Sequence, residues 1–178
     1  LYVAGKTFSE LKSYLRSKVS TIAEVSSDVT LGQMKGIRVS LIGEVRLPGW
    51  YNVSSLHTAL QVLAMAGGVK DIGTLRRIEV RRGNRVVETI DLYDFHLKGE
   101  TGSDTRLLSG DTIFVPVVGT LAALTGEVRR PAIYELKGPT KITELIEMAG
   151  GFTPTAYLAR AQILRAALGK ERTVVDVD

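Results

Sequence analysis

The sequence predicts an α+β fold in which one structural unit occurs twice in tandem. The first observation is a repeat, because the segment 43–51 reappears 83 residues later as 126–134. With the same offset and no gap, ten of the 27 positions in 43–69 are identical. The second observation is that both copies show the same order of elements, a hairpin followed by a helix and then further strands. A repeat of this kind decides the architecture before any single element does.

A hairpin opens the first copy. Apolar and polar residues alternate over 37–42, which is typical of a strand with one buried face. The Pro-Gly pair at 48–49 indicates a turn, and a second strand is predicted over 50–53. The large side chains of this second strand and of its counterpart are expected in the core, with interface anchors as the alternative: Trp50, Tyr51, Ile133 and Tyr134.

A helix follows the hairpin in each copy. Ser54 or Ser55 is the predicted cap of a helix over about 56–66, and Thr140 is the predicted cap in the second copy. Gly67 and Gly150 are expected to end the two helices in the left-handed conformation. The apolar residues of the first helix include helical spacings: Leu56, Leu60, Leu63 and Met65. The core candidates of the second helix are Ile142, Leu145, Ile146 and Ala149.

Further strands complete the first copy. Alternation predicts strands over 77–81 and 86–92, a polar loop over 94–105, and a last strand over 112–116 that Pro116 ends. A hairpin, a helix and then more strands is the order of a β-grasp, in which a mixed sheet wraps one helix. The second copy continues with strands near 158–164 and 174–177 around a Gly169 turn, but it has no counterpart of the last strand.

Residues 1–36 belong to neither copy. Thr7 and Glu10 form a capping box, and an amphipathic helix follows them with Phe8, Leu11, Tyr14, Leu15 and Val19 as its apolar stripe. A short strand at most is expected at 29–31. The predicted domains are 1–36, 37–118 and 119–178, the last incomplete at its C-terminal end. Because the chain starts at Leu1 without a signal-peptide pattern, we expect a fragment or a processed form.

The composition argues against several classes of protein. The net charge is +4, with six basic and three acidic residues in 1–42, nine and nine in 43–118, and eight and seven in 119–178. This distribution and the 6% aromatic content do not indicate a nucleic-acid partner. The absence of Cys excludes disulfides and thiol chemistry, and no apolar run approaches the ~20 residues of a membrane-spanning helix.

The polar residues do not suggest catalysis or a metal site. Glu44 and Glu127 recur, but they belong to separate repeats, so local polar contacts are expected rather than an acid/base pair. His57 and His96 lack a third ligand at metal spacing. The Gly-Gly pairs follow a helix, whereas phosphate-cradling loops precede one. We therefore expect no enzyme and no cofactor.

Arginine provides the candidate contact residues. Four arginines lie on or beside one predicted strand, and two follow the second Gly-Glu-Val motif: Arg76, Arg77, Arg81, Arg82, Arg129 and Arg130. Their expected role is contact with a glycan or with a neighbouring subunit. A solvated strand face explains the strand arginines equally well.

Together, these motifs resemble the SLBB domain, the soluble-ligand-binding β-grasp. The resemblance rests on Gly-Glu-Val followed by Pro-Gly-Trp-Tyr, on the Ala-Gly-Gly helix end, and on the segment 108–116. The residues that define the repeat are Gly43, Glu44, Pro48, Tyr51, Gly67, Gly68, Gly110, Asp111, Gly126, Glu127, Pro131, Tyr134, Gly150 and Gly151. Ala132 stands where the first copy has Gly49, a departure from the pattern.

Two tandem copies behind a helical segment resemble the polysaccharide biosynthesis/export proteins of Gram-negative bacteria, the outer-membrane auxiliary family typified by Wza. The resemblance implies the periplasmic part of an outer-membrane-anchored lipoprotein, and a homo-oligomeric ring that conducts capsular polysaccharide or exopolysaccharide. It also implies an inner-membrane polysaccharide co-polymerase as partner, and 1–36 as the tail of a polysaccharide-export domain. The alternative is a small-ligand-binding or redox-complex accessory module, since SLBB domains also occur outside export systems.

Overall fold

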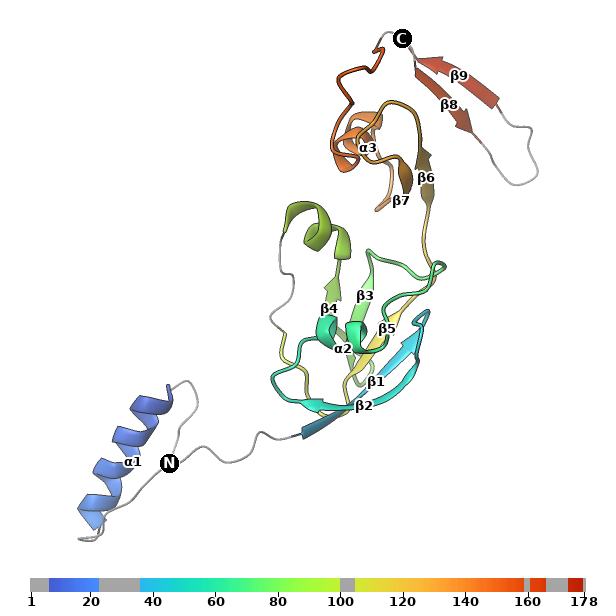
Figure 1. Ribbon diagram of the computed structural model, residues 1–178. Helices are drawn as coiled ribbons and strands as arrows, with labels where there is room; N and C mark the ends of the chain where they lie inside the picture. Colours follow the sequence, from blue (N-terminus) through green and yellow to red (C-terminus); the bar gives the residue numbers. More distant parts are fainter. Residues whose placement is uncertain (1–6, 23–35, 100–104, 159–160, 166–172, 178) are drawn as a thin grey trace. The chain divides into compact units, whose positions relative to one another are not determined.

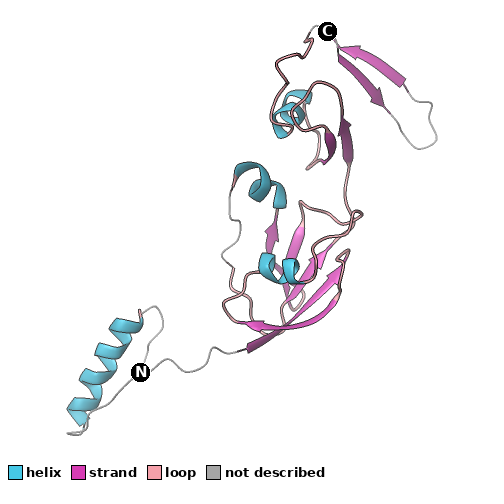
Figure 2. Cartoon of the chain, viewed as in Figure 1, coloured by secondary structure: helices cyan, strands magenta, loops and turns pink. Residues whose placement is uncertain are grey.

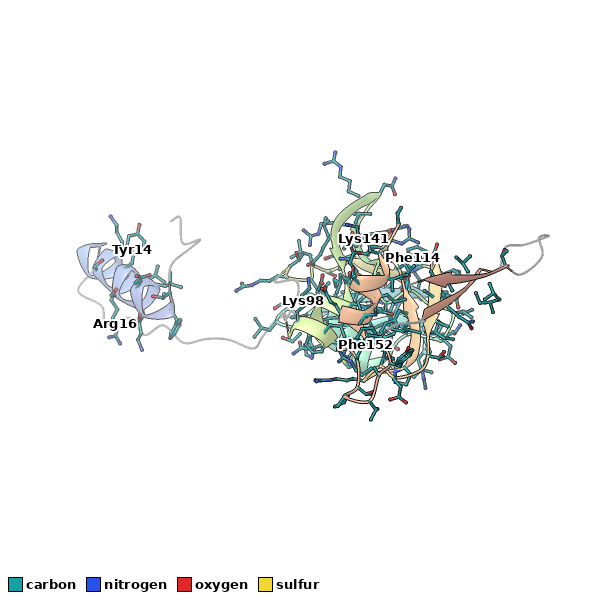
Figure 3. The ribbon with its side chains drawn as sticks, turned by 90° about the horizontal axis from the view of Figure 1, so that it is seen from above. Tyr14, Arg16, Lys98, Phe114, Lys141 and Phe152 are labelled. Carbon is teal, nitrogen blue, oxygen red and sulfur yellow. The ribbon has the colours of Figure 1, made fainter. Side chains whose placement is uncertain are left out.

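The computed structural model describes residues 7–22, 36–99, 105–158, 161–165 and 173–177. The chain divides into two units, 1–35 and 36–178, which are described separately. In the first unit the capping box is confirmed, because the Thr7 amide donates to Glu10 Oε2 (2.9 Å) and the Glu10 amide donates to Thr7 Oγ1 (3.4 Å). These bonds start α1 (Phe8–Ile22), from which Tyr14 and Arg16 project on opposite sides (Figure 3). The strand predicted at 29–31 lies outside the described residues.

The first repeat is a mixed five-stranded sheet with a helix on one face (Figures 1 and 2). Its strands are β1 (Gly36–Gly43), β2 (Gly49–Ser54), β3 (Ile78–Arg82), β4 (Arg85–Ile90) and β5 (Thr112–Val115). They lie in the order β2-β1-β5-β3-β4, in which β1 and β5 run parallel and the other neighbours run antiparallel. The predicted α+β class is confirmed, and the mixed sheet is β-grasp-like.

The core of this repeat lies between the sheet and α2 (Ala59–Met65). Inward side chains alternate along the strands, as the period of two requires. The fully or nearly buried residues include Val39, Leu41, Val62, Ile78, Val80, Ile113 and Val115. Leu107 is also completely buried, although it precedes β5 in a loop. The sheet and α2 therefore share one apolar core, which fixes the orientation of the opposite sheet face.

The start of α2 differs from the prediction. Thr58 is the cap, and it forms a capping box with Gln61, whose side chain accepts from the Thr58 amide (3.0 Å). The Ser54 hydroxyl instead accepts from the Leu56 amide (3.3 Å) in the preceding turn. Because the helix starts later than expected, Leu56 is exposed, as is Met65 at the helix end. The helix predicted over about 56–66 is therefore shorter at its start, and neither Leu56 nor Met65 joins the core.

The second repeat contains β6 (Leu121–Leu124), β7 (Ala132–Glu135), α3 (Ile142–Met148), β8 (Ala161–Arg165) and β9 (Thr173–Val177). In its described residues, β6 pairs with β7 and β8 pairs with β9, both antiparallel. An offset of 83 residues superposes α3 on α2 and β8 on β3 in the sequence. Its buried apolar core consists of Val128, Tyr134 and Ala149, with Leu145 packed against it.

Four further predictions are corrected. Lys141, not Thr140, precedes α3, and the Thr140 hydroxyl donates to the Gly138 carbonyl instead. Trp50 and Ile133 are 61% and 66% exposed rather than buried, because each lies on the strand face opposite Tyr51 and Tyr134. Ile142 is also exposed. The polar loop expected at 94–105 begins with a short π-helical turn, η1 (Asp94–Lys98).

Candidate functional site

The loops that define the repeat have the same hydrogen bonds in both copies. The Tyr51 hydroxyl donates to the Leu47 carbonyl (2.7 Å), and the Tyr134 hydroxyl donates to the Arg130 carbonyl (2.5 Å). Each pair spans the Pro-containing turn of its hairpin, at Pro48 or Pro131. Each tyrosine therefore holds this turn closed in its own repeat.

The Gly-Gly pairs connect each helix end to the preceding hairpin. Gly67 and Gly150 have φ values of +78° and +80°, so the predicted left-handed helix end is confirmed in both repeats. The carbonyl of the second glycine in each pair accepts a hydrogen bond from the Gly-Glu-Val-Arg loop. Gly68 accepts from the Arg46 amide (3.1 Å), and Gly151 accepts from the Arg129 amide (3.0 Å). The repeated sequence thus specifies a repeated backbone connection.

The recurrent glutamates make local polar contacts. The Glu44 carbonyl accepts from the Lys70 amide, and its carboxylate lies 3.5 Å from Lys70 Nζ. The Glu127 carboxylate accepts from the hydroxyls of Thr153 (2.6 Å) and Thr155 (2.8 Å), and these bonds lower the pKa of Glu127. Each glutamate fixes the segment that follows its own Gly-Gly pair. The two carboxylates bond within separate loops.

Asp111 organises the start of β5. Its side chain is 1% exposed and accepts from Arg82 Nε and Nη2, both at 2.9 Å, and from the Leu108 amide (2.8 Å). Burial works to raise the pKa of Asp111, but the bonds from Arg82 and Leu108 and the Arg82 charge hold it below the ordinary value. The preceding Gly110 amide donates to the Arg38 carbonyl (2.8 Å). This turn therefore joins β5 to both β1 and β3.

The candidate arginines do not form one cluster. Arg82 is bound to Asp111, and Arg81 forms an ion pair with Glu79 (2.6 Å) on the outer face of the sheet. Arg77 is exposed, while Arg76 is almost buried. In the second repeat, Arg129 Nε donates to the Phe152 carbonyl (3.4 Å) and Arg130 Nη2 donates to the Met148 carbonyl (3.0 Å). Whether any of the six contacts a glycan or a subunit remains a prediction.

A buried carboxylate joins the two repeats. Glu135, at the end of β7, is 4% exposed. Its Oε1 accepts from the Thr74 hydroxyl (2.6 Å) and the Gly119 amide (3.1 Å), and its Oε2 accepts from the Leu75 amide (2.8 Å). Its own amide donates to the Tyr93 hydroxyl (2.8 Å). The hydrogen bonds to its two carboxylate oxygens offset the free-energy cost of burying this charge.

Arg76 completes this junction. Its Nε donates to the Glu135 carbonyl (2.6 Å), its Nη1 lies 3.3 Å from Asp91 Oδ2, and its guanidinium lies 3.8 Å from the centroid of the Tyr93 ring. Lys137 Nζ also contacts Asp91 (2.7 Å) and Asp94 (3.7 Å). Opposite charges from the two repeats therefore meet here in a partly desolvated network, in which each partner fixes the others.

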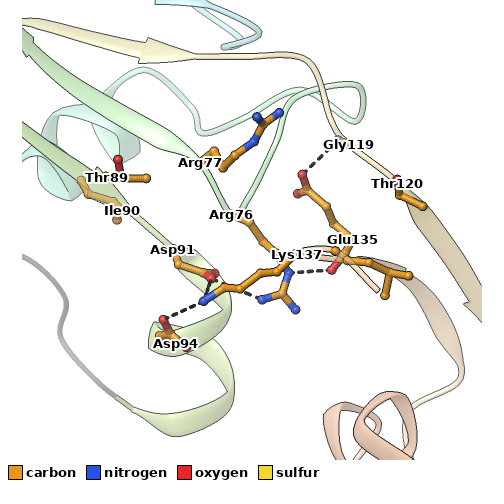
Figure 4. A pocket seen from close by; sticks show the side chains of 12 residues that line it. Arg76, Arg77, Thr89, Ile90, Asp91, Asp94, Gly119, Thr120, Glu135 and Lys137 are labelled. Carbon is orange, nitrogen blue, oxygen red and sulfur yellow. Dashed lines mark hydrogen bonds and ion pairs between the residues drawn. The ribbon is translucent and has the colours of Figure 1, made fainter. Parts of the chain in front are cut away.

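A cleft of about 660 Å³ opens beside this junction (Figure 4). It is lined by residues of both repeats: Arg76, Arg77, Thr89, Ile90, Asp91, Asp94, Gly119, Thr120, Glu135, Leu136, Lys137 and Gly138. Figure 4 shows the ion pairs that Lys137 forms with Asp91 and Asp94 across it. Arg77 lines the cleft too, and within the described residues its guanidinium has no ion pair. The cleft is thus suited to a polar or anionic group.

The described residues contain neither a metal-binding cluster nor a membrane-spanning helix. Among the described residues, no group of His, Asp and Glu side chains has an arrangement that would hold a metal ion. Nor does any helix within the described ranges combine the length and the apolar character required to cross a membrane.

Comparison with known proteins identifies the repeated unit. The SLBB domain family matches residues 38–91 and again residues 121–176. The chain belongs to the SLBB domain family. Two curated relatives, both polysialic acid transport proteins KpsD of Escherichia coli, are 33% and 32% identical over 151 residues, which is 83% of this chain. The chain spans 27% of the length of each relative. It is therefore related to a polysaccharide export protein.

The repeat pattern does not indicate the residues that join the SLBB repeats. Glu135 aligns with Asn52 of the first repeat, so this buried carboxylate is a departure from the repeat. Thr74, Tyr93 and Asp91 are separated from it by 40 residues or more. The one signal was the pattern of β7 itself, because a glutamate directly follows Tyr134 at the end of a short apolar strand.

Proposed function

We propose that this chain is a non-enzymatic part of a polysaccharide export channel, in which SLBB repeats form layers of an oligomeric ring around the glycan. The observation that carries the proposal is the combination of a tandem SLBB match with similarity to a polysialic acid transport protein along most of the chain. Transport requires the glycan to move on after each contact. Weak polar contacts along a hydrated path suit that task better than one tight site.

The proposed place is the periplasmic side of the outer membrane, as part of a protein anchored there. Residues 1–36 would then be the end of a polysaccharide-export domain, and an inner-membrane co-polymerase would deliver the glycan. The tandem arrangement supports a stacked role, because Glu135 and Arg76 connect the repeats through directional bonds rather than through a flexible linker. A defined connection lets each repeat belong to a defined ring layer.

Two exposed or half-exposed arginines provide a direct test in the full-length protein. Replacing Arg77 and Arg81 with Ser removes two positive charges without touching the core. We expect ring assembly or export to fall while the isolated chain keeps its unfolding midpoint. Native mass spectrometry of the membrane-extracted protein measures the ring, and surface polysaccharide measures export. Arg85→Ser and Lys141→Ser, at two exposed positions without an ion pair among the described residues, form the matched control pair.

The outcomes separate the possibilities. A large closed ring in the parent protein supports the channel, and a monomer overturns it. Unchanged rings and unchanged export in the double variant would show that these two arginines contact neither glycan nor subunit.

The cleft beside Glu135 favours a second candidate function, the binding of a small polar ligand. Its volume lies within the range of about 300–1,000 Å³ that is usual for ligand sites. Three of its charged lining residues, Asp91, Asp94 and Lys137, already bind one another, which leaves Arg77 as the cation available to a ligand. A library of small anions screened by thermal shift checks this function, and binding that Arg77→Ser abolishes would support it.

A further inference from the structure

The sheet face opposite α2 presents aromatic rings together with arginines. Trp50 of β2 and Arg38 of β1 are exposed, and the Arg38 guanidinium lies 4.8 Å from the centroid of the Trp50 ring. On β3 and β5, the Arg81 guanidinium lies 4.3 Å from the centroid of Phe114. We call this surface, made by Arg38, Ser40, Trp50, Arg81, Thr112 and Phe114, the outer sheet face.

Strand register places these side chains in a continuous row. Trp50 pairs with Ser40, Ser40 pairs with Thr112, and Thr112 pairs with Arg81. Because neighbouring strands lie about 4.8 Å apart, the row extends about 14 Å across four strands. The Ser40 and Thr112 hydroxyls in its centre bond to each other at 2.7 Å. Ser40 itself is only 6% exposed, so the accessible part of this face is the Arg38–Trp50 pair on one side and Arg81, Thr112 and Phe114 on the other.

Arg38 has unused binding capacity. Within the described residues, no carboxylate forms an ion pair with its guanidinium. The Trp50 ring holds the plane of the guanidinium, while the N–H groups at its edge stay available. A guanidinium with oriented donors binds a carboxylate through two parallel hydrogen bonds. Arg81 shares its charge with Glu79, so it would contribute less.

We propose that the outer sheet face binds an acidic glycan, with Arg38 on a sugar carboxylate and Trp50 against the apolar face of a sugar ring. The inference rests on the proposed export function. Charge complementarity between the Arg38 guanidinium, which has no ion pair among the described residues, and an acidic polymer favours this occupant over a second copy of the chain. The row also matches an extended polymer better than a compact ligand.

The chain contains its own probe for this surface. Trp50 is the only tryptophan, so tryptophan emission, excited selectively over the six tyrosines, reports on the outer sheet face alone. Titration with short polysialic acid should change Trp50 emission saturably, and the change should weaken with added salt because exposed charges are screened. Dextran, a neutral glycan, should leave the emission unchanged. Polyglutamate, an acidic polymer without sugar rings, should bind more weakly than polysialic acid.

Two matched variants test the assignment of Arg38. Arg38→Gln should weaken polysialic acid binding roughly tenfold or more, the effect expected for one charge-assisted contact. Arg85→Gln removes an equally exposed arginine at the start of β4 and should leave binding unchanged. Both side chains are exposed, so the unfolding midpoint should not move in either variant. Equal losses in both variants, or equal binding of polyglutamate, would reduce the surface to a general polyanion site and overturn the proposal.

The remaining outcomes distinguish this inference from the export proposal. Unchanged Trp50 emission in polysialic acid, with intact rings of the full-length protein, overturns the outer sheet face alone. Glycan binding by a full-length protein that stays monomeric contradicts the proposed export channel but supports the glycan site on the outer sheet face. An emission change that depends on chain concentration without sugar would assign the face to a second copy instead.

Discussion

Single side chains stabilise the turns that carry the repeat, and Asp111 is the most buried of them. Its carboxylate holds the Leu108 amide and both nitrogens of one side of the Arg82 guanidinium. Only the Asp111 end of this ion pair is buried, since the Arg82 side chain is 41% exposed, so the free energy that the pair contributes depends mainly on how well the carboxylate is compensated. Asp111 is therefore a residue whose loss should be visible in stability.

We expect Asp111→Asn to lower the free energy of unfolding by about 2 kcal/mol at neutral pH, because a charge-assisted pair becomes a neutral one. The pKa of Asp111 is lowered in the folded chain, so its contribution is present above the unfolded pKa of about 3.9 and is lost as pH falls through the folded pKa. The deficit of the variant should thus shrink below about pH 4. Urea unfolding followed by Trp50 fluorescence measures it.

Asp71→Asn is the matched control, since Asp71 is exposed and no ion pair involves it among the described residues. It should unfold like the parent chain at both pH values. A deficit in Asp111→Asn that stays constant from pH 7 to pH 3 would show that packing, not charge, explains its role.

At the scale of elements, a contact with β5 distinguishes Gly43 from Gly126 within the described residues. Gly43 and Gly126 occupy equivalent positions with φ values of +90° and +94°. A Cβ at Gly43 would overlap the Val115 carbonyl of β5, whereas a Cβ at Gly126 would meet nothing within 4 Å. Within the described residues, the positive φ requires glycine at both positions, and the contact with Val115 requires it at Gly43 as well.

This difference predicts unequal costs for one substitution. Gly126→Ala should destabilise its repeat by about 1–2 kcal/mol through backbone strain. Gly43→Ala adds a clash with the Val115 carbonyl that pushes β1 away from β5. We therefore expect this variant to lower the free energy of unfolding by about 2–5 kcal/mol in total. Hydrogen exchange of the α2 and α3 amides measures each repeat separately. Equal costs at both positions would contradict the role assigned to the contact with β5.

The elements of the first repeat could be predicted because their signals are local. Strand alternation and the glycine helix ends specify β1, β2 and the end of α2 within a few residues. The start of α2 was misjudged because Ser54, Ser55 and Thr58 are all good caps. Gln61, three residues after Thr58, is the feature that selects among them, since a capping box needs that spacing.

The candidate site could be predicted only in part, because its key contacts are long-range. The sequence indicates Arg76 only as one of several arginines on or beside a strand, and its partners Glu135 and Tyr93 are distant in the sequence. Nothing in the local pattern around Glu135 indicates which backbone amides it will meet. Repeat alignment also hides it, since a repeat shows what two units share and not what joins them.

At the scale of the whole molecule, the second SLBB repeat depends on the first. Among the described residues its buried core is small, and Tyr93 of the first repeat packs against it. Glu135, Arg76 and Lys137 add bonds that cross between the repeats. The junction therefore contributes to the stability of the second repeat as well as to its placement.

Removing the Glu135 carboxylate should open this junction. In Glu135→Ala, the Thr74 hydroxyl and the Leu75 and Gly119 amides lose their acceptor, which costs on the order of 3 kcal/mol when the groups stay buried. Hydrogen exchange at Leu75 and Gly119 should then accelerate roughly a hundredfold. Glu144→Ala, at an exposed position on α3, is the control and should leave both amides protected. Because the first repeat has its own core, urea unfolding followed by Trp50 should change little. Slow exchange at both amides in Glu135→Ala would mean that other contacts hold the repeats together, and a large loss in Trp50 unfolding would mean that the two repeats fold as one cooperative unit.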